Sequence, residues 1–304
     1  MRNSIGILIF AITVNLIIIS CDKETDAINI KSGFSIEFSD GTIINEKDIL
    51  FYDSSTCILF LKNEIYLSYK ESFGSMLSCE FAVFIDNDTI YKGIIIPYRT
   101  SMMPPAAYTI IRDESYYDKS VLPIEISLDS VDLRNDLRII SVLEKSYLLN
   151  HGISFTIDSV SVSPNYIPDS NYINKISCVI TIKNNDLINY YILDPKKMGE
   201  SYYSLYNRGL KLLNKATDYT TGFDGIYHSE YGNITIDDFS ILTGGNEVTY
   251  KFSSSDYPQI LSGLYKCSLS LRYSGSYLDL EQADGRIWIG QVNSSIDNVI
   301  IDVE

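Results

Sequence analysis

Residues 264–273 read LYKCSLSLRY, and this stretch decides the fold. Hydrophobic and polar side chains alternate through it, and the predicted inward set is Tyr265, Cys267, Leu269, Leu271 and Tyr273. Strict alternation over this length is typical of a β-strand with one buried face. The stretch therefore predicts an antiparallel strand with the odd-numbered side chains in a core.

The same pattern recurs upstream and downstream. The inward side chains that it predicts in the second half are Ile153, Phe155, Ile157, Val160, Val162, Ile176, Cys178, Ile180, Ile182, Val248, Tyr250, Phe252, Ile287, Ile289, Val299, Ile301 and Val303. Between Ile157 and Val160 the alternation slips by one residue, which indicates a β-bulge. We therefore expect residues 153–304 to form an antiparallel β-sandwich.

In the first half the alternation is equally clear. The three predicted inward sets are Phe34, Ile36 and Phe38; Cys57, Leu59 and Leu61; and Cys79, Phe81, Val83 and Ile85. The polar stretch at 86–88 then predicts a hairpin into 89–91. We expect a separate β-sandwich domain over 30–128.

Between the two halves, residues 132–150 change period. Apolar side chains recur there at steps of three and four, and Asn150-His151-Gly152 follows as a stop signal. This predicts one amphipathic connecting helix within 129–152. Residues 194–240 fit neither period, so we expect an irregular insertion there, with a helix and a hairpin as equal alternatives for 202–215. The predicted fold class is mostly β, with two antiparallel sandwiches.

Cys178 and Cys267 both lie on predicted inward faces, and Tyr265 stands two residues before the second cysteine. This resembles an immunoglobulin-like sandwich, and the resemblance implies a disulfide between the two sheets. Two unpaired cysteines, buried as small apolar groups, are the alternative. For Cys57 and Cys79, a second disulfide and two unpaired thiols are equal alternatives. Trp288 does not lie between the two cysteines in the sequence, as the tryptophan of an antibody-type core does. The resemblance therefore implies only the general sandwich architecture.

The N-terminus begins with Arg2 and an apolar run over 5–19, too short for a permanent membrane helix. The segment Ile18-Ile19-Ser20-Cys21 resembles the bacterial lipobox, which implies acylation of Cys21 after removal of a signal peptide at 1–20. An uncleaved anchor or an ordinary secretory signal is the alternative. In either case the chain is exported; if Cys21 is acylated, the lipid links the protein to the membrane.

Residues 21–29 form an acidic tether. Its start, Asp22-Lys23-Glu24-Thr25-Asp26, resembles the export signal of Bacteroidota surface lipoproteins, which implies a lipid-anchored, surface-exposed protein of the outer membrane. In the enterobacterial sorting pattern, Asp22 instead implies retention in the inner membrane. A plain solvated linker is the third interpretation.

The chain is strongly acidic, with a formal charge of -15 over 304 residues. Removing residues 1–20 takes away one positive charge, that of Arg2, and no acid, so the mature chain is one charge more negative. Such a chain repels phosphate backbones, which argues against a nucleic-acid partner.

Signs of enzymatic chemistry are few. His151 and His228 are the only histidines, no serine or cysteine lies in a nucleophile elbow, and no Cys or His spacing suits zinc. We therefore expect a non-enzymatic protein without cofactor or metal. Carboxylates are abundant, so a glycoside hydrolase stays as the least favoured alternative.

Tyrosine is unusually frequent, with 24 residues. Tyrosines on sandwich loops suit recognition of a glycan or a protein, although strand propensity and core packing also favour them. The candidate binding residues are Tyr190, Tyr191, Tyr202, Tyr203, Tyr219, Tyr227 and Tyr231. We expect a surface binding module. A structural or adhesion subunit that pairs through strand 299–303 is the alternative.

Overall fold

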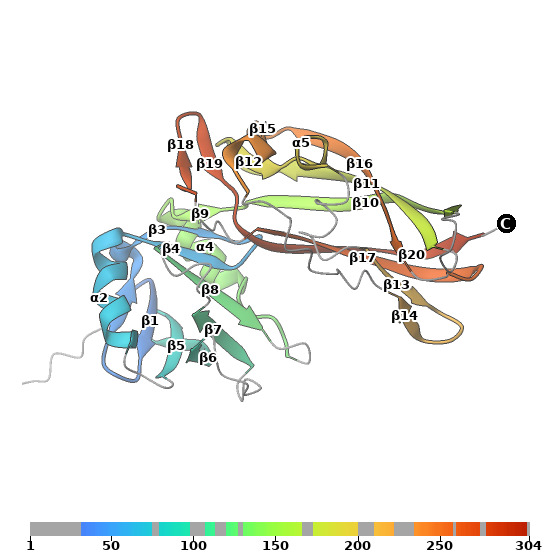
Figure 1. The fold of residues 1–304 in the computed structure, drawn as a ribbon. Coiled ribbons are helices and arrows are strands. Elements are labelled where there is room, and N and C mark those ends of the chain that lie inside the picture. Colours follow the sequence, from blue (N-terminus) through green and yellow to red (C-terminus); the bar gives the residue numbers. More distant parts are fainter. Residues whose placement is uncertain are drawn as a thin grey trace, which may run out of the picture.

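The computed structural model describes residues 32–74, 79–97, 107–112, 120–126, 130–165, 173–199, 210–221, 234–257, 260–273 and 278–302. The fold is mostly β, as predicted. Figure 1 shows two parts side by side, an N-terminal part in blue to green and an elongated C-terminal part in yellow-green to red. We use these names for residues 32–150 and 153–302.

The N-terminal part contains one continuous sheet with the strand order β2-β1-β5-β6-β7-β8-β4-β3-β9. Its strands are β1 (Phe34–Phe38), β2 (Ile43–Asn45), β3 (Ile49–Asp53), β4 (Ile58–Leu61), β5 (Cys79–Ile85), β6 (Asp88–Pro97), β7 (Tyr108–Arg112), β8 (Val121–Ile126) and β9 (Leu149–Asn150). The β6–β7 and β3–β9 pairs are parallel and the others antiparallel. The predicted hairpin at 86–88 joins β5 to β6.

Helix α4 (Leu137–Lys145) confirms the predicted helix in a shorter form. The Asp136 side chain caps its start by accepting a hydrogen bond from the Arg138 N–H. Ile139 and Leu143 are buried in the same hydrophobic cluster as the inner faces of β1 and β5. Helix α4 therefore contributes to the core of the N-terminal part, and β9 adds a strand to its sheet.

A second helix, α2 (Asn63–Gly74), was not predicted. It follows the 3-10 helix η1 (Glu46–Asp48) and strands β3 and β4 along the chain. The Tyr69 hydroxyl donates a hydrogen bond to the Ile43 carbonyl oxygen, at 2.9 Å, which fixes α2 against β2. No helix among the described residues is both long and apolar enough to cross a bilayer.

The described residues of the C-terminal part form three sheets with the strand orders β10-β11-β16, β15-β12-β19-β18 and β14-β13-β17-β20. Its elements are β10 (Ile153–Asn165), β11 (Ile173–Asn184), β12 (Tyr190–Leu193), α5 (Pro195–Met198), β13 (Lys211–Asn214), β14 (Tyr219–Thr221), η2 (Ile236–Asp238), β15 (Phe239–Leu242), β16 (Glu247–Tyr257), β17 (Gly263–Tyr273), β18 (Glu281–Gln282), β19 (Gly285–Ile287) and β20 (Gly290–Ile301). The predicted bulge lies in β10, between Ile157 and Ser159.

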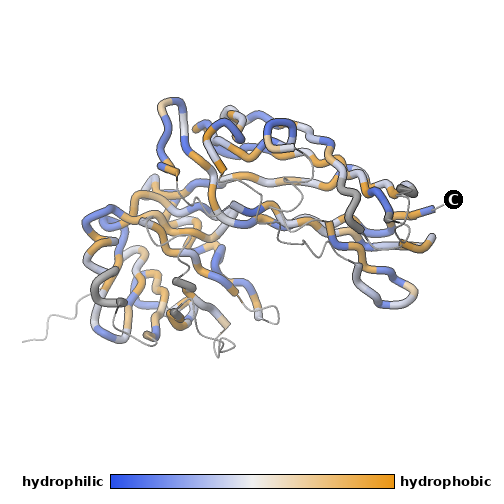
Figure 2. The backbone as a smooth tube through the Cα atoms, viewed as in Figure 1, coloured by the Kyte–Doolittle hydropathy of each residue, from blue (hydrophilic) through white to orange (hydrophobic). Residues whose placement is uncertain are grey.

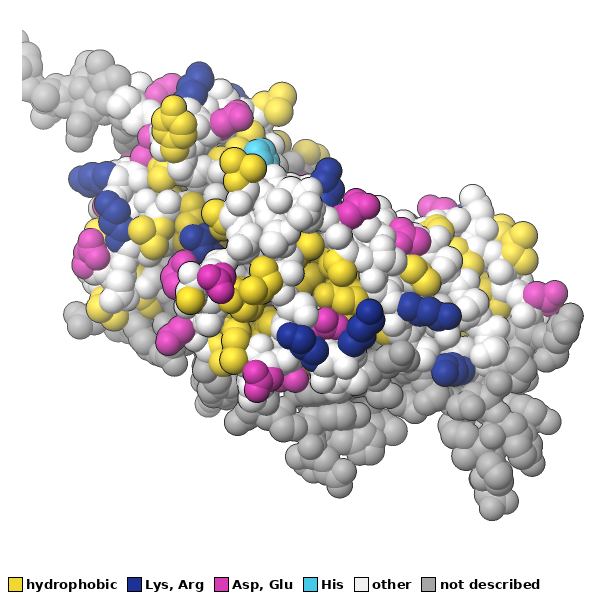
Figure 3. Space-filling model, turned by 90° about the horizontal axis from the view of Figure 1, so that it is seen from above, with side chains coloured by type: hydrophobic (Ala, Val, Ile, Leu, Met, Phe, Trp, Pro, Cys, Tyr) yellow, Lys and Arg dark blue, Asp and Glu magenta, His cyan; other side chains and the backbone are white. Residues whose placement is uncertain are grey.

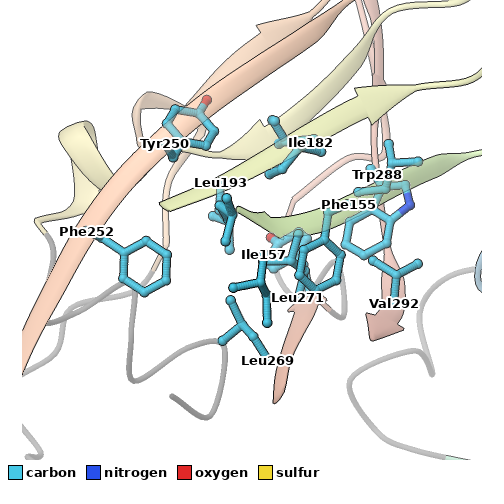
Figure 4. Close-up of a cluster of buried hydrophobic side chains, with 14 of the residues drawn as sticks. Phe155, Ile157, Ile182, Leu193, Tyr250, Phe252, Leu269, Leu271, Trp288 and Val292 are labelled. Atoms are coloured by element: carbon cyan, nitrogen blue, oxygen red, sulfur yellow. The ribbon is translucent and has the colours of Figure 1, made fainter. Parts of the chain in front are cut away.

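The alternating pattern places the core as expected. All five predicted inward residues of β17 are buried, and the polar residues between them are partly exposed. Figure 2 shows this alternation of hydrophobic and hydrophilic residues along the strands. In Figure 4, Phe252 of β16 points into the cluster that contains Leu269 and Leu271 of β17. The Tyr265 hydroxyl donates to the Leu261 carbonyl oxygen at 2.9 Å, which ties the start of β17 to the preceding turn.

Part of the predicted irregular insertion at 194–240 is regular. Strands β13 and β14 form a hairpin, and Leu212 of β13 pairs with Cys267 of β17, so the hairpin extends that sheet. Strand β15 pairs with β12. The prediction was wrong for these strands because they are short and gain their partners from distant segments. Residues 200–209 and 222–233 lie outside the described residues.

The predicted disulfides are not present: Cys57, Cys79, Cys178 and Cys267 are all buried free thiols. Cys178 of β11 and Cys267 of β17 do share one hydrophobic cluster. Burial, with a smaller contribution from Cys267, raises the pKa of the Cys178 thiol to about 12. The pair thus occupies the expected core positions but packs as two small apolar groups.

The two parts share strands β3 and β4. Leu59 and Leu61 belong to the core of the N-terminal part, whereas Ile58 and Phe60 on the opposite face belong to the core of the C-terminal part. Phe51 of β3 joins the C-terminal core in the same way. This short strand pair is therefore covered on both faces.

Candidate functional site

A hollow of about 400 Å³ lies on the outer face of the N-terminal sheet, over strands β1, β5 and β6. Glu37 of β1 stands opposite Ala82 of β5, which in turn stands opposite Lys92 of β6. The Ala82 side chain is a single methyl group between two long side chains, and this difference in size leaves the hollow. We call it the Ala82 hollow; its lining includes Glu37, Ser39, Glu80, Ala82, Phe84, Lys92 and Ile94.

Opposite charges border the Ala82 hollow. Glu80 pairs with Ile94, two residues beyond Lys92, so Glu80 and Lys92 are diagonal neighbours on one face of the sheet. Such neighbours lie about 7 to 8 Å apart, a separation that long side chains can span. Among the described residues neither side chain has an ion-pair partner. Both charged groups are therefore available to a ligand.

Apolar side chains complete the lining. Phe84 and Ile94 are both half-buried and border the same hollow. A concave site that combines apolar surface with a few converging polar groups is the usual form of a small-molecule site. The arrangement can hold a ligand by hydrogen bonds on one side and by apolar contact on another.

A second polar cluster lies where the two parts meet. Asp53 ends β3 and is only 2 % exposed. Its Oδ1 accepts hydrogen bonds from the Ser55 hydroxyl at 2.6 Å, the Ser55 N–H at 2.9 Å and the Thr56 N–H at 3.2 Å. Burial raises the pKa of the Asp53 carboxyl to about 6, the hydrogen bonds oppose the rise, and Asp186 adds to it.

Asp186 holds the chain that links the parts. Its carboxylate accepts from the His151 N–H at 2.8 Å, the Gly152 N–H at 2.7 Å and the Tyr190 hydroxyl at 2.7 Å. Gly152 has a φ of 64°, and a Cβ there would lie 2.4 Å from Asp53 Oδ1. Glycine is therefore required at this position by both conformation and space.

Arg286 joins the parts through aromatic rings. Its guanidinium lies over the Phe51 ring, 3.7 Å from the ring centroid, and its Nε donates to Glu281 Oε1 at 2.8 Å. Phe51 is itself stacked on Phe60, with ring centroids 4.0 Å apart. The contact of Arg286 with the Phe51 ring crosses from β19 to the β3–β4 pair.

The predicted tyrosine site is not brought together among the described residues. Tyr190 is 1 % exposed and bonds to Asp186, so the prediction of a contact residue is wrong for it. Tyr191 is half-buried against the C-terminal core. Tyr219 is 68 % exposed, but it lies on β14, in a different sheet from β12. The remaining candidates outside the described residues are Tyr202, Tyr203, Tyr227 and Tyr231, as are Cys21 and His228.

Sequence reasoning missed the Ala82 hollow. Its local signal is one small residue among large outward neighbours, in the run Glu80-Phe81-Ala82-Val83-Phe84. The hollow also depends on Glu37 and Lys92, which come from two other strands. Strand pairing was needed to find it, and periodicity within one strand does not supply that.

Cys57 and Cys267 are poor nucleophiles. Burial raises the pKa of the Cys57 thiol, with the Arg134 guanidinium opposing the rise, and burial raises that of Cys267 to about 12. A thiol reacts as its thiolate, so these groups stay inert near neutral pH. Within the described ranges no three Cys, His, Asp or Glu side chains gather in a metal-binding arrangement.

The acidic character is not concentrated on the face drawn in Figure 3, where acidic and basic side chains are interspersed with hydrophobic ones. Comparisons with protein-family models, curated proteins and solved structures found no match.

Proposed function

We propose that the protein is a lipid-anchored surface lipoprotein that acts as a non-enzymatic binding module for a glycan. The apolar run at 5–19 that precedes Cys21 and the acidic tether support the anchor and an outer-membrane, surface-exposed location. The Ala82 hollow is the observation that carries the binding role. In this proposal it replaces the tyrosine cluster as the binding site.

The size and lining of the hollow favour a sugar. Its volume of about 400 Å³ falls within the range of small-molecule sites. Carboxylate and ammonium groups such as those of Glu80 and Lys92 form strong hydrogen bonds with hydroxyl groups. The half-buried Phe84 and Ile94 offer apolar contact to the less polar face of a sugar ring. A glycan satisfies all of these groups at once.

A glycan array with the ectodomain of residues 27–304 tests this proposal. Ala82→Phe fills the hollow from the outer face and should leave the core untouched. Ser161→Phe is the matched control, because Ser161 is an exposed strand residue of β10 in the C-terminal part. Binding by the wild type and the control, lost in Ala82→Phe, supports the site. Equal binding by all three proteins contradicts it.

The C-terminal part supports a finer proposal about fold, namely an immunoglobulin-like sandwich. Tyr265 stands two residues before Cys267, and its hydroxyl bonds to the backbone four residues upstream, as in the tyrosine corner of that class. Cys178 lies on β11 and Cys267 on β17, in one shared core. An experimental structure in which these strands lie in one sheet would contradict the proposal.

A glycoside hydrolase is a second candidate, because the hollow has two carboxyl side chains in its lining. Glu37 stands opposite Ala82, and Glu80 precedes Ala82 by two residues on the same face. Glycoside hydrolysis needs two acids flanking the bond. Shortened products from a bound glycan, absent with Glu80→Gln, would favour the hydrolase over the binding module.

The adhesion alternative has one supporting observation. Strand β20 is an edge strand of its sheet, and Ile300 on it is 80 % exposed beside Leu264 of β17. Assembly that depends on concentration and is abolished by Ile300→Ser, with the fold intact, would favour this role. Monomeric behaviour at high concentration would contradict it.

A further inference from the structure

The link between the two parts is held from both sides. Ser55 Oγ donates to Asp53 Oδ1 and also accepts from the Ile153 N–H, at 3.3 Å. The two preceding N–H groups, those of His151 and Gly152, donate to the Asp186 carboxylate. Three consecutive backbone N–H groups therefore end on two carboxylate networks, one from each part. We call residues 151–153 the joint.

Burial disfavours the charged form of the Asp53 carboxyl. It is buried, and the groups that act on it electrostatically come from several elements. Asp186 and Tyr190 face it from the C-terminal part, and Cys57 belongs to the turn that follows Asp53. Arg286 of β19 lies close enough to Tyr190 to oppose the rise in its pKa. Asp186 is a second carboxylate, so a charge on Asp53 places two like charges beside the joint.

We infer that the joint responds to pH: with Asp53 protonated it stays dry and closed, and with Asp53 ionised it admits water and loosens. An ionised carboxylate in a dry site loses its hydration, and letting water in between Asp53 and Gly152 restores it. Entry of water also increases the distance between the Asp53 and Asp186 carboxylates. The hydrogen bonds that break are those that join Asp53 to Ser55 and Ser55 to the Ile153 N–H.

The direction and size of this pH response follow from the linkage between protonation of Asp53 and opening of the joint. The Asp53 pKa of about 6 in the closed joint lies above the ordinary value of about 3.9 that a hydrated joint restores. The open form therefore binds fewer protons and gains as the pH rises. Between pH 5 and pH 8 the ratio of open to closed joint should increase about tenfold. This behaviour goes beyond ligand binding and does not depend on the proposed glycan.

Amide hydrogen exchange of the full chain in detergent micelles tests the inference. The readout is a peptide spanning 149–156, corrected for the intrinsic effect of pH on exchange. The wild type should lose about tenfold protection there between pH 5 and pH 8. A peptide from the centre of β11, residues 176–182, should keep its protection at both pH values.

Three variants sharpen the test. Asp53→Asn imitates the protonated side chain and should keep the joint protected at both pH values. Ser55→Ala breaks the chain to Ile153 and should leave the joint weakly protected at both. Asp158→Asn is the matched control, because Asp158 is an exposed carboxylate of β10 that accepts from Thr156 and Thr181. It should reproduce the wild-type response.

Each other outcome overturns the inference. Equal protection of the wild-type joint at pH 5 and pH 8 would show that it does not respond to pH. A tenfold response that persists in Asp53→Asn would assign the change to another group. Equal loss of protection in the joint and in β11 would show general unfolding in place of a local opening.

Discussion

The guanidinium of Arg286 lies 3.7 Å from the centroid of the Phe51 ring, although the two residues belong to different parts of the molecule. Phe51 is buried, so the contact is largely removed from water. Cation–π contacts are stronger when they are desolvated. This pair therefore contributes to holding the two parts in one orientation.

Replacing Arg286 with Ala should lower the free energy of unfolding by about 1 to 3 kcal/mol, because it removes the cation–π contact and uncovers the Phe51–Phe60 stack. Urea unfolding at pH 7 measures the change. Arg138→Ala is the control, since Arg138 forms an exposed ion pair with Asp136, and such pairs contribute little. Equal effects of the two substitutions would contradict a special role for Arg286.

Gly290→Ala should destabilise the protein by about 2 to 4 kcal/mol. Gly290 has a φ of 119°, and a Cβ there would lie 2.5 Å from the Thr56 side chain across the interface between the parts. Gly245→Ala measures the cost of the left-handed backbone conformation without a steric clash. Gly245 has a φ of 73°, and nothing lies within 4 Å of its Cβ position. This substitution should cost about 1 kcal/mol. Thermal unfolding of both variants provides the measurement.

The four cysteines of residues 27–304 should react with a thiol reagent as free thiols once the protein is denatured. Cys57, Cys79, Cys178 and Cys267 are buried, so a thiol reagent should modify none of them rapidly in the native protein and all four after denaturation. Quantitative labelling followed by mass measurement gives the number. Two thiols in denaturant would instead reveal one of the disulfides that the sequence predicted.

Stability should fall as the pH rises from about 4 to about 7. The Asp53 pKa is raised to about 6, above its unfolded value of about 3.9, so its contribution is complete below about pH 4 and is lost as the pH rises through 6. The loss between pH 4 and pH 8 is about 2 to 3 kcal/mol. Urea unfolding across this range measures it, and Asp53→Asn should flatten the profile.

Asp136 has the opposite effect on the pH dependence of stability, and at lower pH. Its hydrogen bonds with Arg138 lower the Asp136 pKa to about 2, so its contribution is present above about pH 4 and is lost as the pH falls through 2. Asp136→Ala should therefore weaken the dependence on acid pH while leaving the range above pH 5 unchanged in shape. An unchanged acid limb would contradict this assignment.

The features that could be predicted from the sequence are those that depend on the periodicity of hydrophobic residues within one segment. The inward residues of β17, the bulge after Ile157 and the turn after Ile85 were found because each is encoded within one short segment. Helix α2 was missed because Leu67 is exposed and the apolar residues of 63–74 do not form one stripe. The Ala82 hollow and the joint were beyond reach because each combines residues from distant strands.

One signal was present but interpreted too narrowly. Residues 58–61 read Ile-Leu-Phe-Leu, a continuous apolar run that indicates burial on both faces of a strand. The alternation assigned Leu59 and Leu61 to a core and left Ile58 and Phe60 unexplained. Their partners belong to the C-terminal part, which no local pattern identifies.

Burial of β4 on both faces also constrains how this protein can change over generations. A recombination event that exchanged the C-terminal part for an unrelated sandwich would leave Ile58 and Phe60 without their apolar neighbours. The reverse exchange would strip Arg286 of the Phe51 ring on which it lies. The two parts must therefore be inherited together, and substitutions on one side of this strand are expected to select compensating substitutions on the other.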